Sequence, residues 1–407
     1  MLTEKEVDEL LQPIIDEQEN VNFWVVMLII KRLREIGSIP VSELNSLKYL
    51  ARTQQDLKLI TKELKRIMRR QILNISNFLK TIALDSYLDS KVYFNAKGLE
   101  FPNFKDNKGV QRILTNTTNN AISAYERMIR TQAFMIRDPQ HPTILKPTPL
   151  SEAYKNIIHE AARKVVDNEV DYKTAMRKTT RQLVDSGLRE VIYDPQSRKR
   201  YTQRTDVAVR RNLLDSVRAV NQGIQDEVGA QFGADGKEIT VHECPALDHE
   251  PVQGHQFSNE EFDKLQTEQP FQDYYGKQFA PIRRAIGMWN CRHFTFSIVL
   301  GVNPPIHTES ELKGIIDRNH KGYTMPNGKH LTMYDCTQMQ RKLELKIKKA
   351  KEQQVASRER DDVDEAKKWQ KEINSAMNEY YSFSKACGLQ PLPTKITVSG
   401  YRKISTK

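Results

Sequence analysis

The sequence predicts a mainly α-helical protein that also contains a small α+β domain. Apolar residues recur at helical spacing through the first third of the chain, and a long, highly charged helical stretch covers residues 335–386. Between them, short apolar runs such as residues 294–300 include β-branched side chains and are typical of buried strands. The chain has 407 residues, which is enough for two or three domains with a real core.

Residues 1–137 are expected to form a helical region. Thr3 and Glu6 have the spacing of a capping box, in which each side chain satisfies a backbone N–H of the first turn. A second helix is expected to end at Gly37, because glycine readily adopts the left-handed conformation that closes a helix. The helices expected after the first one cover residues 20–36, 42–84 and 110–134.

Residues 138–150 are expected to be a proline-rich linker, because four prolines in so short a stretch cannot sustain a helix. Residues 151–305 form the predicted mixed α+β domain. Two expected helices of this domain cover residues 151–170 and 172–186, and a third begins at Thr205. The expected strands cover residues 190–193, 199–202, 238–242 and 294–300. The helix after Thr205 has an apolar stripe of Leu213, Val217, Val220, Ile224 and Val228.

Residues 306–389 are expected to be charged helices that fold back as an antiparallel hairpin, with a turn between 353 and 361. Residues 390–407 are a basic tail, expected to be disordered alone or to act as an arm on a neighbouring molecule. Residues 341–407 contain 16 Lys or Arg and 9 Asp or Glu, so they supply +7 of the net charge of +11. Such a balance favours anionic partners, nucleic acid above all, although a well-solvated helical surface explains it equally well. The candidate contact residues are Arg341, Lys342, Lys346, Lys348, Lys349 and Lys351.

Several common classes of protein do not fit the sequence. We find no phosphate-binding loop, no dinucleotide-binding glycine pattern and no signature of a metalloprotease or serine hydrolase. The N-terminus lacks a signal peptide, and the longest apolar run, Phe23 to Ile30, is far short of the ~20 residues of a membrane span. Four cysteines are too few for a disulfide scaffold, which favours a reducing compartment. We therefore expect no membrane contact and no enzymatic activity of a common type.

The block between residues 241 and 301 gathers histidines and cysteines. His242, His249, Cys291 and His293 could supply the thiolate and imidazole ligands of a structural zinc ion, with Cys244 and His255 as spare candidates. The spacing is not that of a standard zinc finger, so two alternatives stay open. The histidines could hydrogen-bond buried backbone groups, or Cys291 could act as a nucleophile with His249 or His293 as base and Asp248 as the orienting group.

The same block resembles the minor capsid, or head-morphogenesis, proteins of tailed bacteriophages. The resemblance rests on His242-x6-His249-x3-Gln253-Gly254-x2-Phe257 followed by Trp289-Asn290-Cys291-Arg292-His293. Three further stretches agree with the family in the same order: residues 173–187, 204–211 and 338–347. Cys244-Pro245 departs from the family pattern, in which a glycine and small residues are usual, and this weakens any shared role of Cys244.

The resemblance implies a structural head protein that assembles at or near the portal vertex of the virion, in the cytoplasm of the bacterial host. Its implied partners are the portal protein, the major capsid protein or both, and possible non-specific contact with packaged double-stranded DNA follows from the basic C-terminal residues. One alternative is a DNA-associated internal head protein that is ejected with the genome. A second alternative is an enzyme that depends on a metal or on the Cys/His block.

Overall fold

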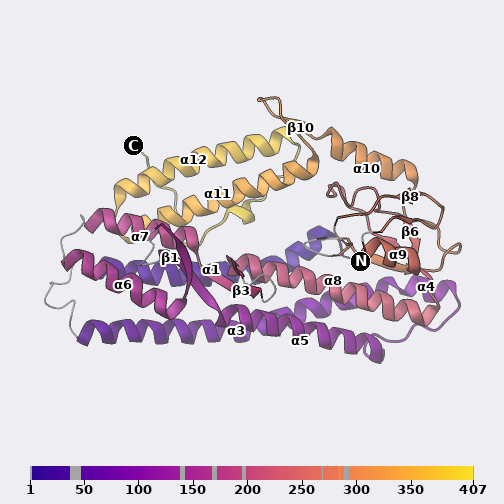
Figure 1. The fold of residues 1–407 in the computed structure, drawn as a ribbon, viewed down its shortest axis with the longest axis horizontal. Coiled ribbons are helices and arrows are strands. Elements are labelled where there is room, and N and C mark those ends of the chain that lie inside the picture. Colours follow the sequence, from indigo (N-terminus) through magenta and orange to yellow (C-terminus); the bar gives the residue numbers. More distant parts are fainter. Residues whose placement is uncertain are drawn as a thin grey trace. The chain divides into compact units, whose positions relative to one another are not determined.

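The computed structural model describes residues 2–36, 47–137, 143–166, 172–194, 199–267, 269–283, 285–287, 291 and 293–406 (Figure 1). The chain is mostly helical with small antiparallel sheets, which confirms the predicted fold class. Its contacts divide it into two compact units. The first unit comprises residues 1–13, 72–124 and 210–338, and the second comprises 14–71, 125–209 and 339–407. Each unit thus draws on three separated stretches, whereas the sequence suggested domains that follow one another along the chain.

The N-terminal helix α1 spans Glu4–Ile36 without interruption. Its predicted capping box is confirmed, since the Thr3 N–H donates to Glu6 Oε2 over 2.8 Å and the Glu6 N–H donates to Thr3 Oγ1 over 3.3 Å. The prediction of a separate second helix was wrong, because the chain continues helically through Pro13. Gly37, the expected end of the second helix, lies outside the described residues.

Among the described residues of the N-terminal third, α1 is followed by α3 at Leu47–Asp89, α4 at Lys91–Ala96 and α5 at Lys108–Arg130. The expected helix to residue 134 ends earlier, and Gln132–Arg137 instead form strand β1. This strand pairs with neighbours on both sides, and Phe134 is fully buried. Pairing and burial in the sheet therefore override the helical spacing of the last few residues.

The second unit contains a four-stranded antiparallel sheet with the order β2-β1-β3-β4. Besides β1, its strands are β2 at Leu145–Pro149, β3 at Arg189–Asp194 and β4 at Lys199–Arg204. Strand β2 lies within the stretch expected to be a linker. An edge strand tolerates proline because one side of it needs no N–H donors, and Pro147 pairs with Met135 from that edge.

Helices α6 at Leu150–Val166 and α7 at Tyr172–Ser186 share a core with α1 and β1. Gly187 ends α7 with a φ of +56°, in agreement with the expected stop. A buried polar group lies beside this core, where the Arg32 guanidinium pairs with Asp56 and the Tyr154 hydroxyl donates to the same carboxylate over 2.5 Å. Burial is the main reason that the pKa of this tyrosine lies well above its ordinary value.

The predicted antiparallel hairpin of charged helices is present as α11 at Met333–Glu359 and α12 at Val363–Ala386 (Figure 1). Gln340 bonds Ser384 and Gln354 bonds Gln370, so contacts move up one helix as they move down the other. The turn lies at the end of the predicted interval. Asp361 adopts a φ of +56°, and the Asp362 carboxylate caps α12 by accepting from the Glu365 N–H.

The C-terminal residues pack on their own hairpin, in contrast to the expected disordered tail, and the alternative of an arm on a neighbouring molecule stays a prediction. Lys351 Nζ donates to the Ile396 carbonyl over 2.6 Å, and Gln354 Nε2 donates to the Arg402 carbonyl over 2.7 Å. Ile396 is buried and ends the short 3-10 helix η1 at Pro393–Ile396. Buried polar side chains of the hairpin need partners, and the tail backbone supplies them.

The first unit is built around helix α8 at Thr205–Phe232 and a three-stranded antiparallel sheet with the order β6-β5-β9. The strands are β5 at Gly236–Ile239, β6 at Gln256–Ser258 and β9 at Thr295–Ile298. The predicted apolar stripe of α8 is fully buried, and Thr295 Oγ1 on β9 donates to Gln222 Oε1 on this helix over 2.6 Å.

Short elements complete the first unit. They are α9 at Asn259–Gln266, β7 at Phe271–Gln272, β8 at Gln278–Phe279, α10 at Glu309–Lys321, β10 at Tyr323–Thr324 and β11 at His330–Leu331. Side chains from β5, β6, β7, β8 and α9 form one apolar cluster with Val252. In the described part of the chain, no helix combines the length and the apolar character that crossing a bilayer requires.

We expect Asp362→Asn to destabilise the second unit by about 2 kcal/mol, because it removes the negative charge of a nearly buried partner of Arg177, whereas the Asn oxygen can still cap α12. Arg177 holds the pKa of Asp362 below its ordinary value near 3.8. The stabilisation is therefore complete above that value and is lost as the pH falls through the lower pKa of the folded state. Urea unfolding of wild type and variant between pH 7 and pH 3 measures this difference. Asp364→Asn, at an exposed carboxylate of the same turn, should leave stability almost unchanged.

Candidate functional site

The His/Cys block lies where three strands of the first unit meet at one sheet edge. Strands β6 and β9 both run antiparallel to β5, so the end of β5 lies beside the beginnings of the other two. His242 follows β5, His249 belongs to the loop before β6, and Cys291 and His293 precede β9. The sheet topology therefore collects residues that are about fifty positions apart in the sequence.

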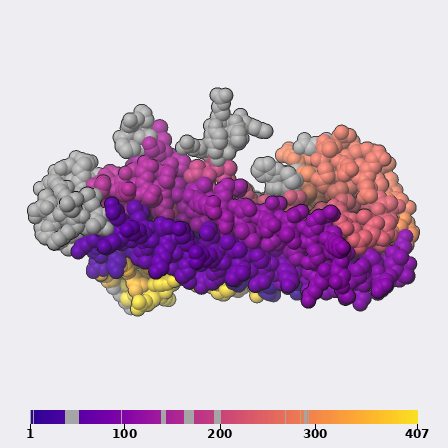
Figure 2. Space-filling model, turned by 90° about the horizontal axis from the view of Figure 1, so that it is seen from below, coloured from indigo at the N-terminus to yellow at the C-terminus, as the bar shows by residue number. Residues whose placement is uncertain are grey.

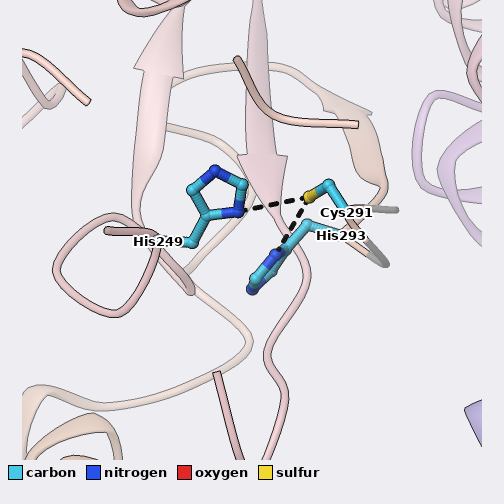
Figure 3. A group of neighbouring side chains, drawn as sticks. All are labelled: His249, Cys291 and His293. Carbon is cyan, nitrogen blue, oxygen red and sulfur yellow. Dashed lines mark hydrogen bonds between the residues drawn. The ribbon is translucent and has the colours of Figure 1, made fainter. Parts of the chain in front are cut away.

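Three of the four predicted metal ligands converge in space (Figure 3). The Cys291 sulfur lies 3.3 Å from His249 Nδ1 and 3.4 Å from His293 Nδ1, and the three ligand atoms lie within 4.8 Å of one another. Both histidines are almost fully buried, and Cys291 is half-buried. One thiol and two imidazoles, all turned inward, form a set of soft and borderline ligands.

The far nitrogens of both imidazoles face oxygen atoms. His293 Nε2 lies 3.3 Å from Gln253 Oε1, and His249 Nε2 lies 3.7 Å from an Asp248 carboxylate oxygen. The same Gln253 oxygen accepts from the His242 backbone N–H over 2.9 Å, which fixes the orientation of the amide. The oxygen bonded at His293 Nε2 favours the tautomer that carries its proton there, and the charge of the Asp248 carboxylate favours the same tautomer of His249. In this tautomer the Nδ1 lone pairs of both rings are directed at the Cys291 sulfur.

His242, the fourth predicted ligand, lies beside this group rather than within it. Its ring packs edge-on against the ring of His293, with their centroids 4.3 Å apart. The spare candidate Cys244 is half-buried and is not part of the converging set. Trp289, Asn290 and Arg292 of the recognised motif lie outside the described residues. The structure thus brings together His249, Cys291 and His293.

His255 belongs to a separate polar group. Its Nδ1 lies 2.9 Å from Asp273 Oδ2, and its Nε2 lies 3.1 Å from Lys277 Nζ. Burial, aided by the nearby lysine, lowers the pKa of His255, which favours the neutral ring with its proton on the Asp273 side. The Asp273 carboxylate also accepts from the Lys277 backbone N–H. These bonds hold the turn between β7 and β8, so His255 has a structural role there.

The loop that carries His249 is held by helix α10. Glu250 accepts from Asn319 Nδ2 over 2.8 Å and lies 2.7 Å from His320 Nε2. Gly254 ends the loop with a φ of +74° and packs so closely that a Cβ there would lie 2.4 Å from Leu312 Cδ2. Only glycine fits this position without strain, which explains its place in the motif.

The structure divides the six basic candidates of α11 into two groups. Lys351 is buried against the tail, where it also lies 4.8 Å from the Tyr401 ring centre, and Lys348 pairs with Glu19 over 2.5 Å. Both side chains therefore make contacts within the second unit. The others, Arg341, Lys342, Lys346 and Lys349, are exposed or half-buried, although Lys346 pairs with Glu379 over 2.9 Å.

A second basic face on helix α3 was not predicted from the sequence. Lys58, Lys62, Lys65 and Arg69 are all exposed and follow one another at helical spacing on this helix, whose indigo surface lies on the face seen in Figure 2. The helical spacing of these four cations could have indicated a basic face on this helix. The larger net charge of residues 341–407 led us to predict the basic contact residues in the C-terminal helices.

The family model described as Phage minor capsid protein 2 matches residues 2–383 of the chain. The match covers nearly the whole sequence, so the chain belongs to this family of phage minor capsid proteins. It is therefore a structural component of a bacteriophage capsid, as the resemblance implied. Neither the comparison with curated proteins nor the comparison with solved structures returned a match.

We expect Gly254→Ala to destabilise the first unit more than Gly276→Ala. Both glycines have positive φ angles, +74° and +87°, so both substitutions carry similar backbone strain. Only the alanine at 254 would also overlap Leu312 and Val241, which adds about 1–3 kcal/mol. Chemical unfolding of the two variants measures the difference, and equal losses would show that the loop relaxes without cost.

Proposed function

We propose that this minor capsid protein assembles at or near the portal vertex of the phage head, in the cytoplasm of the bacterial host. The family match over residues 2–383 carries the structural role, and the resemblance of the His/Cys motif to portal-adjacent head proteins supports the location. Family membership also favours a structural role over an enzyme that uses the His/Cys block. The portal protein, the major capsid protein or both are the proposed partners.

The location is tested by chemical cross-linking of intact virions followed by mass spectrometry. We expect cross-links from exposed lysines of this protein to concentrate on the portal protein and on the few capsid subunits around it. Cross-links spread evenly over the major capsid protein would contradict the portal location. The protein should also remain in particles that have released their DNA, whereas its loss with the genome would support the alternative of an ejected internal protein.

We further propose that four cations in the middle of helix α11, Arg341, Lys342, Lys346 and Lys349, contact packaged DNA. Arg341, Lys342 and Lys346 are exposed and Lys349 is half-buried, with Lys346 paired to Glu379, whereas Lys348 is half-buried against Glu19 and Lys351 is buried against the tail. Phosphate contacts of this kind are independent of base sequence and weaken steeply as the salt concentration rises. A protein inside a packed head meets a high density of phosphate, which suits such weak contacts.

Two charge-matched variants test this contact. In the first, Arg341, Lys342, Lys346 and Lys349 are replaced by Gln, and in the second, Lys58, Lys62, Lys65 and Arg69 of α3 are replaced by Gln. Both variants have four fewer positive charges, so a purely general effect of net charge would weaken binding to duplex DNA equally. We expect the first variant to bind more weakly at low salt, and the slope of its salt dependence to fall by roughly 0.9 for each phosphate that is no longer neutralised.

Binding that falls only in the second variant would instead assign the DNA contact to α3. Unchanged binding in both variants would remove DNA from the proposed partners. Circular dichroism of each variant should match wild type, because the replaced side chains lie at the surface.

A further inference from the structure

We propose that His249, Cys291 and His293 bind one zinc ion, which fastens the loop before β6 to the beginning of β9. The proposal goes beyond the capsid role and does not depend on it. It rests on three convergent ligand atoms, on the outer oxygens that orient the imidazoles and on the position of the group at the sheet edge.

The distances agree with a shared metal ion. Zinc holds thiolate sulfur at about 2.3 Å and imidazole nitrogen at about 2.0 Å, so a tetrahedral arrangement separates sulfur from nitrogen by roughly 3.5 Å. The observed separations from Cys291 Sγ are 3.3 Å to His249 Nδ1 and 3.4 Å to His293 Nδ1. An ion placed among the three atoms would therefore need little movement of the side chains.

The protons of the group also favour a cation. With the Nε2 protons directed at Gln253 and Asp248, both Nδ1 atoms present lone pairs to the cysteine. A zinc ion accepts all three ligand atoms at once and takes the sulfur as thiolate, while the oxygens at Nε2 act as the outer partners that metal-bound histidines usually have.

The position of the group gives the ion a mechanical role. His249 belongs to a loop without regular strand pairing, and Cys291 and His293 lie just before a strand of four residues. So short a sheet provides few hydrogen bonds to hold these segments together. Zinc binding would add its binding free energy to the stability of the folded first unit. The three residues occupy three of the four coordination positions of the zinc ion. His242 packs beside the site and is not assigned as a ligand.

The test begins with the full-length protein produced in zinc-supplemented medium and dialysed against metal-free buffer. Metal analysis should find one zinc ion per chain. His249→Ala, Cys291→Ser and His293→Ala should each lose it, whereas His330→Ala, at an exposed histidine of the same unit, should keep it. Less than about one tenth of an equivalent of zinc in the wild type, together with no uptake on titration, would overturn the proposal.

Cobalt substitution tests the ligands even where a variant folds poorly. Wild-type protein stripped of zinc and loaded with Co²⁺ should show the near-ultraviolet band of cobalt-bound thiolate and the strong visible bands of tetrahedral coordination. The thiolate band should disappear in Cys291→Ser and persist in Cys244→Ser, the matched cysteine of the same block. Loss of the band in Cys244→Ser alone would assign the metal to a different set of residues and would overturn the proposal.

Chelation tests the mechanical role in the unmodified chain. Removal of zinc should lower the midpoint of thermal unfolding, and one equivalent of zinc should restore it. An unchanged midpoint in a protein from which bound zinc has been removed would show that the ion does not fasten the loop to β9.

Discussion

Antiparallel pairing of one short strand with two others organises the first unit. β5 has a neighbour on each side, and both neighbours begin where β5 ends. The loops that enter and leave these strands must therefore meet at a single edge. His249 and His293 come together for this reason, although neither lies in a strand. A parallel arrangement would have placed the beginnings of the neighbouring strands at the opposite edge, and the cluster would not exist.

The helical core of the second unit contains several buried or half-buried ion pairs. Arg32 and Tyr154 share the carboxylate of Asp56, and Arg204 lies between Asp206 and Glu352. Buried ion pairs of this type are weak sources of net stability, but loss of one partner leaves a buried charge and is costly. They favour one packing of charged helices over the alternatives, because few arrangements satisfy every charge. Many of the charges in residues 341–407 thus serve packing, and only the exposed ones remain for partners.

The family and the structure agree on the kind of protein that this sequence specifies. A minor capsid protein has a structural role in the capsid, and the long helices of this chain provide extended surfaces for it. The His/Cys motif is its most recognisable sequence feature, and the structure gives that motif a physical reason. Gln253 and Gly254 belong to the motif because one holds the backbone of His242 near the ring of His293, and the other allows the loop to close against Leu312.

The sequence by itself determined most of the long helices and the C-terminal hairpin. The stripe of α8, the capping box of α1 and the stop at Gly187 all follow from local chemistry, because side-chain spacing and glycine conformation act within a few residues. It also identified His249, Cys291 and His293, the three residues of the proposed metal site, by type and by motif, together with His242, which lies beside them. Local rules failed at Pro13, where the chain stays helical through a residue that should interrupt it.

Only the tertiary structure decided which of those residues meet. The register of β5 with β9 selects His249, Cys291 and His293 and leaves His242 against the side of one ring, and spacing alone cannot give that register. The same holds for strand β1, whose first residues were expected to be helical. It also holds for the tail, whose position depends on buried glutamines of the hairpin that precedes it. Contacts between distant segments set these outcomes, because burial and polar pairing there outweigh the small local preferences.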